Sequence, residues 1–254
     1  MKYINTYSNT NAYNNAISSM SFPNVSFIEA SDEVKYARSK AATCDIYGSY
    51  SAGTTPSTIS LNGTNLTVRD MGNNQWGWNT ATAGIGTLTD MSYMFNYSSD
   101  WLVSVDAFKV NTSSVTNMKY MFYNCKKLAS INLAGLDTSS VTNMESMFYG
   151  CSLATIDLSG LDVSKVTNMK NLASSCTNLV TIYLDGWSMN SGVNAQNMLS
   201  YNSKLRHIHM NGTPLFTFDT VKGTLSGSVR NAVTIHRDGL AWTWNGSQWA
   251  STEE

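Results

Sequence analysis

Residues 115–140 read VTNMKYMFYNCKKLASINLAGLDTSS, and residues 141–165 read VTNMESMFYGCSLATIDLSGLDVSK. The stretch that follows, from Val166, reads VTNMKNLASSCTNLVTIYLDGWSMNSG. A diverged copy starts at Leu88, and another spans residues 197–212. About five copies with a period near 26 residues therefore fill residues 87–212, and self-similarity at one period indicates a repeat architecture.

Each repeat combines two spacings of apolar residues. Met118, Met121 and Phe122 stand at i, i+3 and i+4, which predicts one face of a short helix, capped by the preceding Thr-Asn pair. Ile131 and Leu133 alternate with polar residues and predict a short strand. Because one such unit cannot bury its own apolar face, successive units are expected to stack on a shared core. A glycine after each strand is expected to supply a turn, at Gly135, Gly160 and Gly186.

The consensus V-T-N-M-x-x-M-F-x-x-C-x-x-L-x-x-I-x-L-x-G-L-D resembles the BspA-type leucine-rich repeat, which is common in bacterial surface proteins and found in some phage and protist proteins. The resemblance covers residues 87–212 and implies an α/β fold. That fold is a right-handed solenoid with a parallel strand ladder on one face and short helices on the other, between small β-rich flanks. The resemblance also implies adhesion or surface presentation rather than catalysis. Recognition surfaces vary within the family, so no functional residue is carried over.

The flanks differ from the repeats. Residues 1–40 are polar with a Tyr-rich start, and they are similar to the N-termini of structural proteins from phages of gut bacteria, including the crAss-like group, and of some anaerobe surface proteins. This likeness implies an attachment segment. Residues 41–86 carry alternating segments broken by Asn-Gly and Gly-Asn-Asn, which predicts β-hairpins. Residues 213–254 carry two alternating segments joined by Arg-Asp-Gly, which predicts a hairpin that caps the repeats.

Composition and charge narrow the functional classes. Only 13% of the 254 residues are charged and the net charge is −1. Since no cluster of Lys and Arg occurs, binding to nucleic acid or to an anionic membrane surface is not expected. No apolar run approaches the ~20 residues of a membrane-spanning helix, and residues 1–30 show no signal peptide. The absence of recognised catalytic or cofactor-binding motifs predicts neither enzymatic activity nor a cofactor.

In the predicted strands, the residues between core positions point out of the sheet. Neighbouring strands are ~4.8 Å apart, so two outward rows would form one polar strip. The strip is either a ligand-contact face, where Tyr and polar groups recognise a polar partner, or only a solvated face of the sheet. The rows are Asp106, Asn132, Asp157, Tyr183 and His209, and beside them Ser104, Ser130, Thr155, Thr181 and His207. The candidate contact residues are Asp106, Asn132, Asp157, Tyr183, His207 and His209.

Two chemical functions can be weighed for the strip. Asp106 and Asp157 stand two repeats apart, roughly 10 Å, which is just beyond the ~6.5–9.5 Å of an inverting glycosidase pair. His207 and His209 form an H-x-H pair, but a normal zinc site needs more ligands, and only Tyr183 and Asp157 are near in the sequence pattern. The preferred interpretation is therefore a strip without catalysis or metal, with exposed strand histidines.

Of the four cysteines, none lies in a C-x-x-C pair, and Cys125, Cys151 and Cys176 occupy one position of successive repeats. A reactive thiol would need a basic neighbour or a helix N-terminus, so a buried ladder of reduced thiols is expected. The methionines of the repeats are expected to fill the core. A further ladder that satisfies backbone groups is expected from Asn117, Asn143 and Asn168.

Two functions stay open on this basis. The first is a phage virion structural protein of the fibre or decoration type, which presents the repeats to the host cell or its glycans and attaches to other virion or surface proteins through residues 1–40. The second is a BspA-like adhesin on a bacterial surface that binds host or matrix proteins. For both, we expect a homo-oligomer that binds a protein or glycan through the repeat face, with no membrane insertion. Localisation in the virion is the primary expectation.

Overall fold

The computed structural model describes residues 44–79, 86–96, 98–212, 225, 232–245 and 247–253. The chain divides into two compact units, residues 1–32 and residues 33–254, and every described residue belongs to the second unit. The predicted attachment segment, residues 1–40, therefore lies outside the described residues. The same holds for most of residues 213–231, where the predicted C-terminal cap begins.

Short strands make up the regular structure of the described residues. The strands that precede and enter the first repeat are β1 (Ile46–Ser49), β2 (Thr58–Leu61), β3 (Thr64–Thr67), β4 (Arg69–Gly72), β5 (Gln75–Trp78), β6 (Ser104–Val105) and β7 (Ala107–Phe108). The following repeats contribute β8 (Ser130–Ile131), β9 (Thr155–Asp157), β10 (Thr181–Tyr183) and β11 (His207–His209). The C-terminal strands are β12 (Thr234–Arg237), β13 (Leu240–Trp244) and β14 (Trp249–Glu253).

The predicted fold class, an α/β leucine-rich-repeat solenoid with short helices on one face, is wrong. The described residues contain no helix, and their strands form separate sheets of four, six, two and two strands. This part of the chain is therefore all-β. The apolar spacing predicted a helix at residues 118–122, but residues 119–124 form turns instead.

Hydrogen bonds between repeats explain why the i, i+3, i+4 spacing does not produce a helix. The backbone N–H groups of Met118, Tyr120 and Phe122 donate to carbonyls of the next repeat, whereas those of Met121 and Tyr123 donate to the carbonyl three residues back. Tyr120 has a φ of 58°, a left-handed conformation that an α-helix does not contain. Because tight turns alternate with bonds to the neighbouring repeat, the apolar side chains reach the core without a helical backbone.

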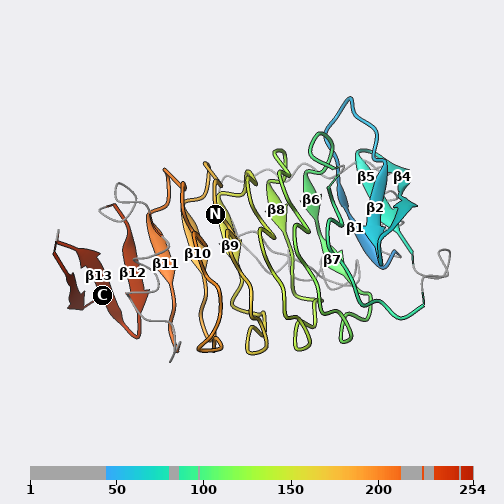
Figure 1. The fold of residues 1–254 in the computed structure, drawn as a ribbon. Helices are drawn as coiled ribbons and strands as arrows, with labels where there is room; N and C mark the ends of the chain where they lie inside the picture. Colours follow the sequence, from blue (N-terminus) through green and yellow to red (C-terminus); the bar gives the residue numbers. More distant parts are fainter. Residues whose placement is uncertain are drawn as a thin grey trace, which may run out of the picture. The chain divides into compact units, whose positions relative to one another are not determined.

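Parallel pairing joins strands of successive repeats. In the six-stranded sheet, β9, β10, β11 and β12 pair in chain order, and Ile156, Ile182 and Ile208 lie opposite one another. β13 and β14 then extend this sheet in antiparallel fashion. Figure 1 shows β9 to β13 side by side in this order. A second parallel ladder, made of single bridges, runs through Asp90, Asn117, Asn143, Asn168 and Asn194.

One apolar core runs through the repeats. The rings of Phe95, Phe122 and Phe148 are fully buried and stack in order, with centroids 5.0 Å and 5.2 Å apart. The methionines of the M-x-x-M-F segments are buried as well, which confirms their predicted place in the core. Ile156 is fully buried as predicted, whereas Ile131 is only partly buried. In the described residues β8 pairs with β6 alone, so the second edge of its strand is not covered by a neighbouring strand.

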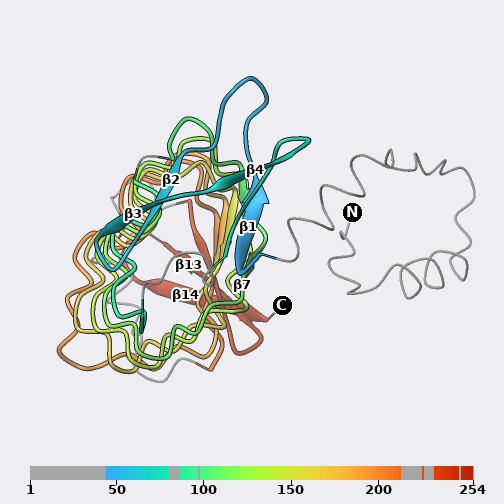
Figure 2. The same cartoon turned by 90° about the vertical axis from the view of Figure 1, so that its right-hand side faces the viewer.

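Hairpins precede and follow the repeats, as the sequence predicted. β2 and β3 are joined by Asn62-Gly63, and β12 and β13 by Asp238-Gly239; all four residues have positive φ, as two-residue type I′ turns require. β1 pairs with β5 on one edge and with β7 of the first repeat on the other, which bonds the first hairpins to the repeats. Viewed along the stack, the backbone traces of successive repeats follow one another closely (Figure 2).

Gly135 lies in the predicted turn, which the Leu136 N–H closes on the Leu133 carbonyl, and it has a second role. Gly135 does not have a positive φ, but a Cβ at this position would lie 1.6 Å from the Phe108 carbonyl oxygen of the preceding repeat. Gly135 therefore permits close approach of two backbones rather than a left-handed turn. Gly186, with a φ of 75°, does occupy a left-handed turn.

Candidate functional site

Four of the predicted contact residues lie together on the six-stranded sheet. Asp157, Tyr183 and His209 form one row across β9, β10 and β11, because these strands pair in parallel with the three residues in register. His207 lies in the neighbouring row, opposite Thr181. Asp157 is exposed, whereas Tyr183, His207 and His209 are half-buried.

The other two predicted contact residues belong to a different sheet region. Asp106 and Asn132 directly follow β6 and β8, which form a separate two-stranded sheet. The repeat at residues 141–165 has one residue fewer than the repeat at residues 115–140 between its cysteine and its strand, and β8 and β9 do not pair in the described part of the chain. The predicted strip is therefore divided between two sheets, one that contains β8 and one that contains β9.

Contacts within the chain engage two polar side chains of the strip, Asn132 and Asp157. Asn132 Nδ2 donates to the Asp106 carbonyl at 3.1 Å, and Asn132 Oδ1 accepts from the Ala134 N–H at 3.0 Å. The Asp157 carboxylate accepts from the Ser159 N–H at 3.0 Å and from its hydroxyl at 2.6 Å. Asn132 and Asp157 thus fix the turns after their strands, as Asx turns commonly do.

All three histidines of the chain meet where β11 pairs with β12. The rings of Tyr183, His209 and His236 stack in order, with 4.4 Å between successive centroids. His207 Nδ1 and His236 Nε2 share a hydrogen bond of 3.0 Å, in which the donor depends on the tautomers. His207 and His209 lie in a strand on either side of buried Ile208, as predicted, but they are half-buried rather than exposed, because the rings pack on one another.

The described residues hold no group of three or more His, Cys, Asp and Glu side chains that could bind a metal ion. In the same residues, no helix is long and apolar enough to span a bilayer.

The predicted cysteine ladder is present. Cys125, Cys151 and Cys176 are buried free thiols, and each Sγ donates to the carbonyl of a phenylalanine in the preceding repeat, at 3.8, 3.0 and 2.9 Å. Burial raises the pKa of Cys125 and of Cys176 to about 12, and it also raises the pKa of Cys151. Since the thiolate is the nucleophile, these three residues are structural.

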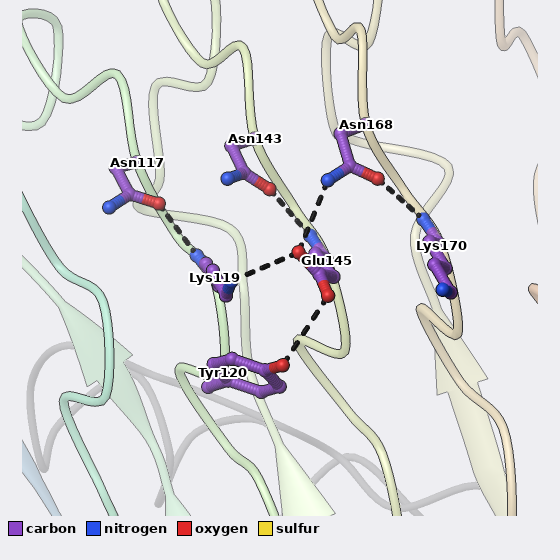
Figure 3. Close-up of polar contacts among 7 residues, drawn as sticks. All are labelled: Asn117, Lys119, Tyr120, Asn143, Glu145, Asn168 and Lys170. Carbon is purple, nitrogen blue, oxygen red and sulfur yellow. Dashed lines mark hydrogen bonds and ion pairs between the residues drawn. The ribbon is translucent and has the colours of Figure 1, made fainter. Parts of the chain in front are cut away.

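The predicted asparagine ladder also forms. The Oδ1 atom of each asparagine accepts the backbone N–H two residues further on, at 3.1, 3.0 and 3.1 Å (Figure 3). These bonds fix the backbone where each repeat enters its M-x-x-M-F turn, so the three asparagine side chains have a structural role. The ladder residues are Asn117, Asn143 and Asn168.

A groove of about 380 Å³ opens over the M-x-x-M-F turns, and the sequence reasoning did not predict it. Four of the lining residues are tyrosines, the others are Asn and Ser, and none is charged. Tyr93 is 44% exposed, whereas Ser146 is buried. The lining residues are Tyr93, Asn96, Tyr120, Tyr123, Ser146, Tyr149 and Asn171.

The groove forms because a row of tyrosines is interrupted. One position of four successive repeats, with φ between 53° and 58°, carries Tyr93, Tyr120, Ser146 and Asn171 in that order. Tyr93 and Tyr120 pack with their ring centroids 4.9 Å apart, but the small Ser146 offers Tyr120 no ring in the next repeat. Three residues along the chain, Tyr123 and Tyr149 stack at 5.2 Å with an angle of 14° between ring planes.

Glu145 holds the tyrosine at the edge of this opening (Figure 3). Its carboxylate accepts from the Lys119 ammonium at 3.1 Å, the Tyr120 hydroxyl at 3.3 Å and the Asn168 amide at 3.2 Å. Burial by itself raises the pKa of Glu145, but the hydrogen bond and charge of Lys119, with the bonds from Asn168 and Tyr120, outweigh it and lower the pKa. The bond to Glu145 raises the pKa of Lys119. The two opposite charges beside the groove therefore balance each other.

The groove and His236 are the features that sequence reasoning missed. A signal for the groove was present, because tyrosine recurs at equivalent positions of adjacent repeats, at 93 and 120 and again at 123 and 149. The predicted helix did not indicate a groove, because tyrosines on the helices of neighbouring repeats would be separated differently. The signal for His236 was the segment V-T-I-H, which repeats the alternation of R-H-I-H in the preceding strand.

Comparison with known proteins gives one match. A model of the family described as "Mycoplasma protein of unknown function, DUF285" matches residues 89–211, slightly less than half of the chain. This stretch includes the whole groove and all strands from β6 to β11. No curated protein and no solved structure matches the chain. The repeats are thus similar to a family whose description names no activity.

Proposed function

We propose that the protein is a non-catalytic attachment protein of a phage particle, of the fibre or decoration type, and that it binds a polar partner on the host cell through the tyrosine groove. The groove carries the binding role in this proposal, because it gathers four tyrosines beside small polar residues. Tyrosine supplies a large contact area at a low cost in side-chain entropy, which is why binding sites are rich in it.

The backbone around the groove supports a binding role. The N–H groups of Tyr120 and Ser146 donate to carbonyls of the following repeat, and Glu145 fixes the Tyr120 hydroxyl. A surface that is already ordered loses little conformational entropy when a ligand binds. The groove is therefore suited to recognition without rearrangement.

A second contact surface is proposed on the six-stranded sheet. Of the strip predicted from the sequence, Tyr183, His207 and His209 form an aromatic and polar cluster with His236. We give this cluster a secondary role, because Asn132 and Asp157 of the same strip already fix turns in the chain. Replacement of Tyr183 and His209 by Ala is expected to weaken attachment less than loss of the groove does.

The docking role of residues 1–40 also belongs to this proposal, and the likeness of this segment to phage structural proteins supports it. A chain that lacks residues 1–40 is expected to keep the circular dichroism spectrum of its repeats but to be missing from purified particles. Normal incorporation of the truncated chain would contradict the docking role.

Cell binding by the full chain tests the role of the groove. Fluorescently labelled wild type is compared with the double variant Tyr123→Ala, Tyr149→Ala on intact host cells. Tyr201→Ala is the control, because Tyr201 is 66% exposed and does not line the groove. We expect at least tenfold weaker binding for the double variant and wild-type binding for the control. Equal binding by all three proteins would contradict the proposal.

The alternative function, a BspA-like surface adhesin, predicts a different location. Mass spectrometry of gradient-purified particles and of surface proteins shaved from the producing cells separates the two. Peptides of this chain in the particles support the virion function. Peptides found only on the cell surface would favour the adhesin.

A further inference from the structure

The spacing of the repeats sets the size of the opening at Ser146. Rings at equivalent positions of adjacent repeats are 4.9 Å apart for Tyr93 and Tyr120 and 5.2 Å apart for Tyr123 and Tyr149. A ring at the Ser146 position would therefore lie about 5 Å beyond Tyr120, within the range in which rings pack. Serine leaves that space to the groove.

Tyrosine rings border this opening on two sides. Tyr120 precedes it by one repeat, and its hydroxyl is held by Glu145. Tyr149 follows three residues after Ser146; it stacks on Tyr123, and the equivalent position of the next repeat is Ser174, which has no ring. The opening is therefore a slot for a flat, ring-shaped group.

The chemistry of the lining indicates what kind of ring fits. The hydroxyl of Ser146 and the amide of Asn171 in the next repeat offer hydrogen-bond donors and acceptors at the slot. A sugar ring presents C–H groups on its faces and hydroxyl groups at its rim, so it can pack on tyrosine and bond to these groups together. An aromatic side chain of a peptide would fill the slot but leave the polar groups without partners, which is costly.

The lack of charge in the groove lining narrows the class of ligand further. None of the lining residues is charged, and Lys119 and Glu145 beside the groove are paired with each other at 3.1 Å. An acidic or basic sugar would lose hydration in the slot without gaining a counter-charge from the lining residues.

We propose that the groove binds a neutral pyranose of a glycan at the level of Ser146, where the sugar ring takes the place of the missing tyrosine. This inference rests on the proposed function and names the ligand class of the same site. Tyr120 and Tyr149 pack against the sugar, and Asn171 and the Ser146 hydroxyl bond to its rim.

Ser146→Tyr tests the proposal directly, because it fills the slot with the chain's own side chain. Tyr93 and Tyr120 already hold φ values of 56° and 58° at this repeat position, so the backbone at Ser146 accepts tyrosine. Ser175→Tyr is the matched control: Ser175 has a φ of 61°, its equivalent in the next repeat is Tyr201 at 63°, and it does not line the groove. Both variants are expected to melt within a few degrees of wild type.

The probe is a printed array of neutral and acidic glycans, to which the full chain and both variants are applied. We expect wild type and Ser175→Tyr to bind neutral hexose or N-acetylhexosamine glycans, and Ser146→Tyr to bind them at least tenfold more weakly. Absence of binding to every glycan, binding confined to acidic glycans, or full binding by Ser146→Tyr would each overturn the inference.

The same variant separates this inference from the proposed function. If Ser146→Tyr loses attachment to cells while the array shows no glycan binding, the groove binds a protein and only the glycan inference fails. If Ser146→Tyr attaches to cells like wild type, the role of the groove in attachment fails as well.

Discussion

Cys176 and Asn202 occupy the same position of consecutive repeats and make the same kind of hydrogen bond to the repeat before. Cys176 Sγ donates to the Phe148 carbonyl at 2.9 Å, and Asn202 Nδ2 donates to the Ala173 carbonyl at 2.8 Å. Asn202 Oδ1 also accepts the Cys176 N–H at 2.8 Å. A buried donor at this position thus bonds to a carbonyl of the preceding repeat, and both cysteine and asparagine can supply it.

Replacement of Asn202 by Ala should destabilise the protein by about 2–4 kcal/mol, because buried donor and acceptor groups lose their partners. Asn202→Cys should cost less, since the thiol can restore the bond to Ala173. Urea unfolding followed by circular dichroism measures both changes. The exposed Asn178→Ala is the control, with a change expected below about 0.5 kcal/mol. Equal stability of Asn202→Ala and wild type would refute the role of the ladder.

The buried thiols should resist alkylation in the folded protein. Because burial raises the pKa of Cys125 and of Cys176 to about 12, almost no thiolate is present at pH 8. Iodoacetamide is expected to label Cys125, Cys151 and Cys176 slowly in buffer and quickly in guanidinium chloride, as followed by peptide mass spectrometry. Rapid labelling of all three in buffer would show that the ladder is not buried.

A charge in the shared core should disrupt the stack. Ile156 is fully buried in the core and lies opposite Ile182 of the next repeat. Ile156→Asp is therefore expected to lower the free energy of unfolding by roughly 4 kcal/mol or more. Thr155→Asp is the matched control, because Thr155 is an exposed neighbour in the same strand. Ile131→Asp should cost less than Ile156→Asp, since Ile131 is only partly buried. Similar melting temperatures for Ile156→Asp and Thr155→Asp would contradict the register of β9.

The Glu145 network should make stability depend on pH in a defined direction. The folded pKa of Glu145 lies below its usual value of 4.5, so its contribution is present above that value and is lost as the pH falls through the folded pKa. The pKa of Lys119 lies above 10.5, so its contribution is lost only as the pH rises through that raised value. Between these limits, Glu145→Gln should lower the free energy of unfolding by about 0.5–1 kcal/mol, a value reduced by solvent exposure of the pair.

Urea unfolding of wild type and Glu145→Gln at pH 3 and pH 7 measures this effect. The difference between the two proteins should be present at pH 7 and smaller at pH 3. Glu253→Gln serves as the control, because Glu253 is exposed at the end of β14. A difference between wild type and Glu145→Gln that stays constant with pH would show that Glu145 acts only through its shape.

Local sequence signals sufficed for several parts of this molecule. The period near 26 residues, the buried Met and Phe positions, and the cysteine and asparagine ladders follow from identical residues that recur at identical positions. The turns at Asn62-Gly63 and Asp238-Gly239 follow from residues that readily adopt positive φ. Each of these features depends on a residue's own preference or on its copy in the adjacent repeat.

Contacts between repeats decided the rest. The spacing of Met118, Met121 and Phe122 is compatible with a helix and with a ladder of turns, and only the N–H bonds to the next repeat select the ladder. The same ladder brings tyrosines of neighbouring repeats about 5 Å apart and leaves the opening at Ser146. His236 likewise joins His207 and His209 only because β12 pairs with β11. The sequence by itself thus determined which residues repeat and which are buried, whereas hydrogen bonds between distant residues determined the backbone conformation and the site.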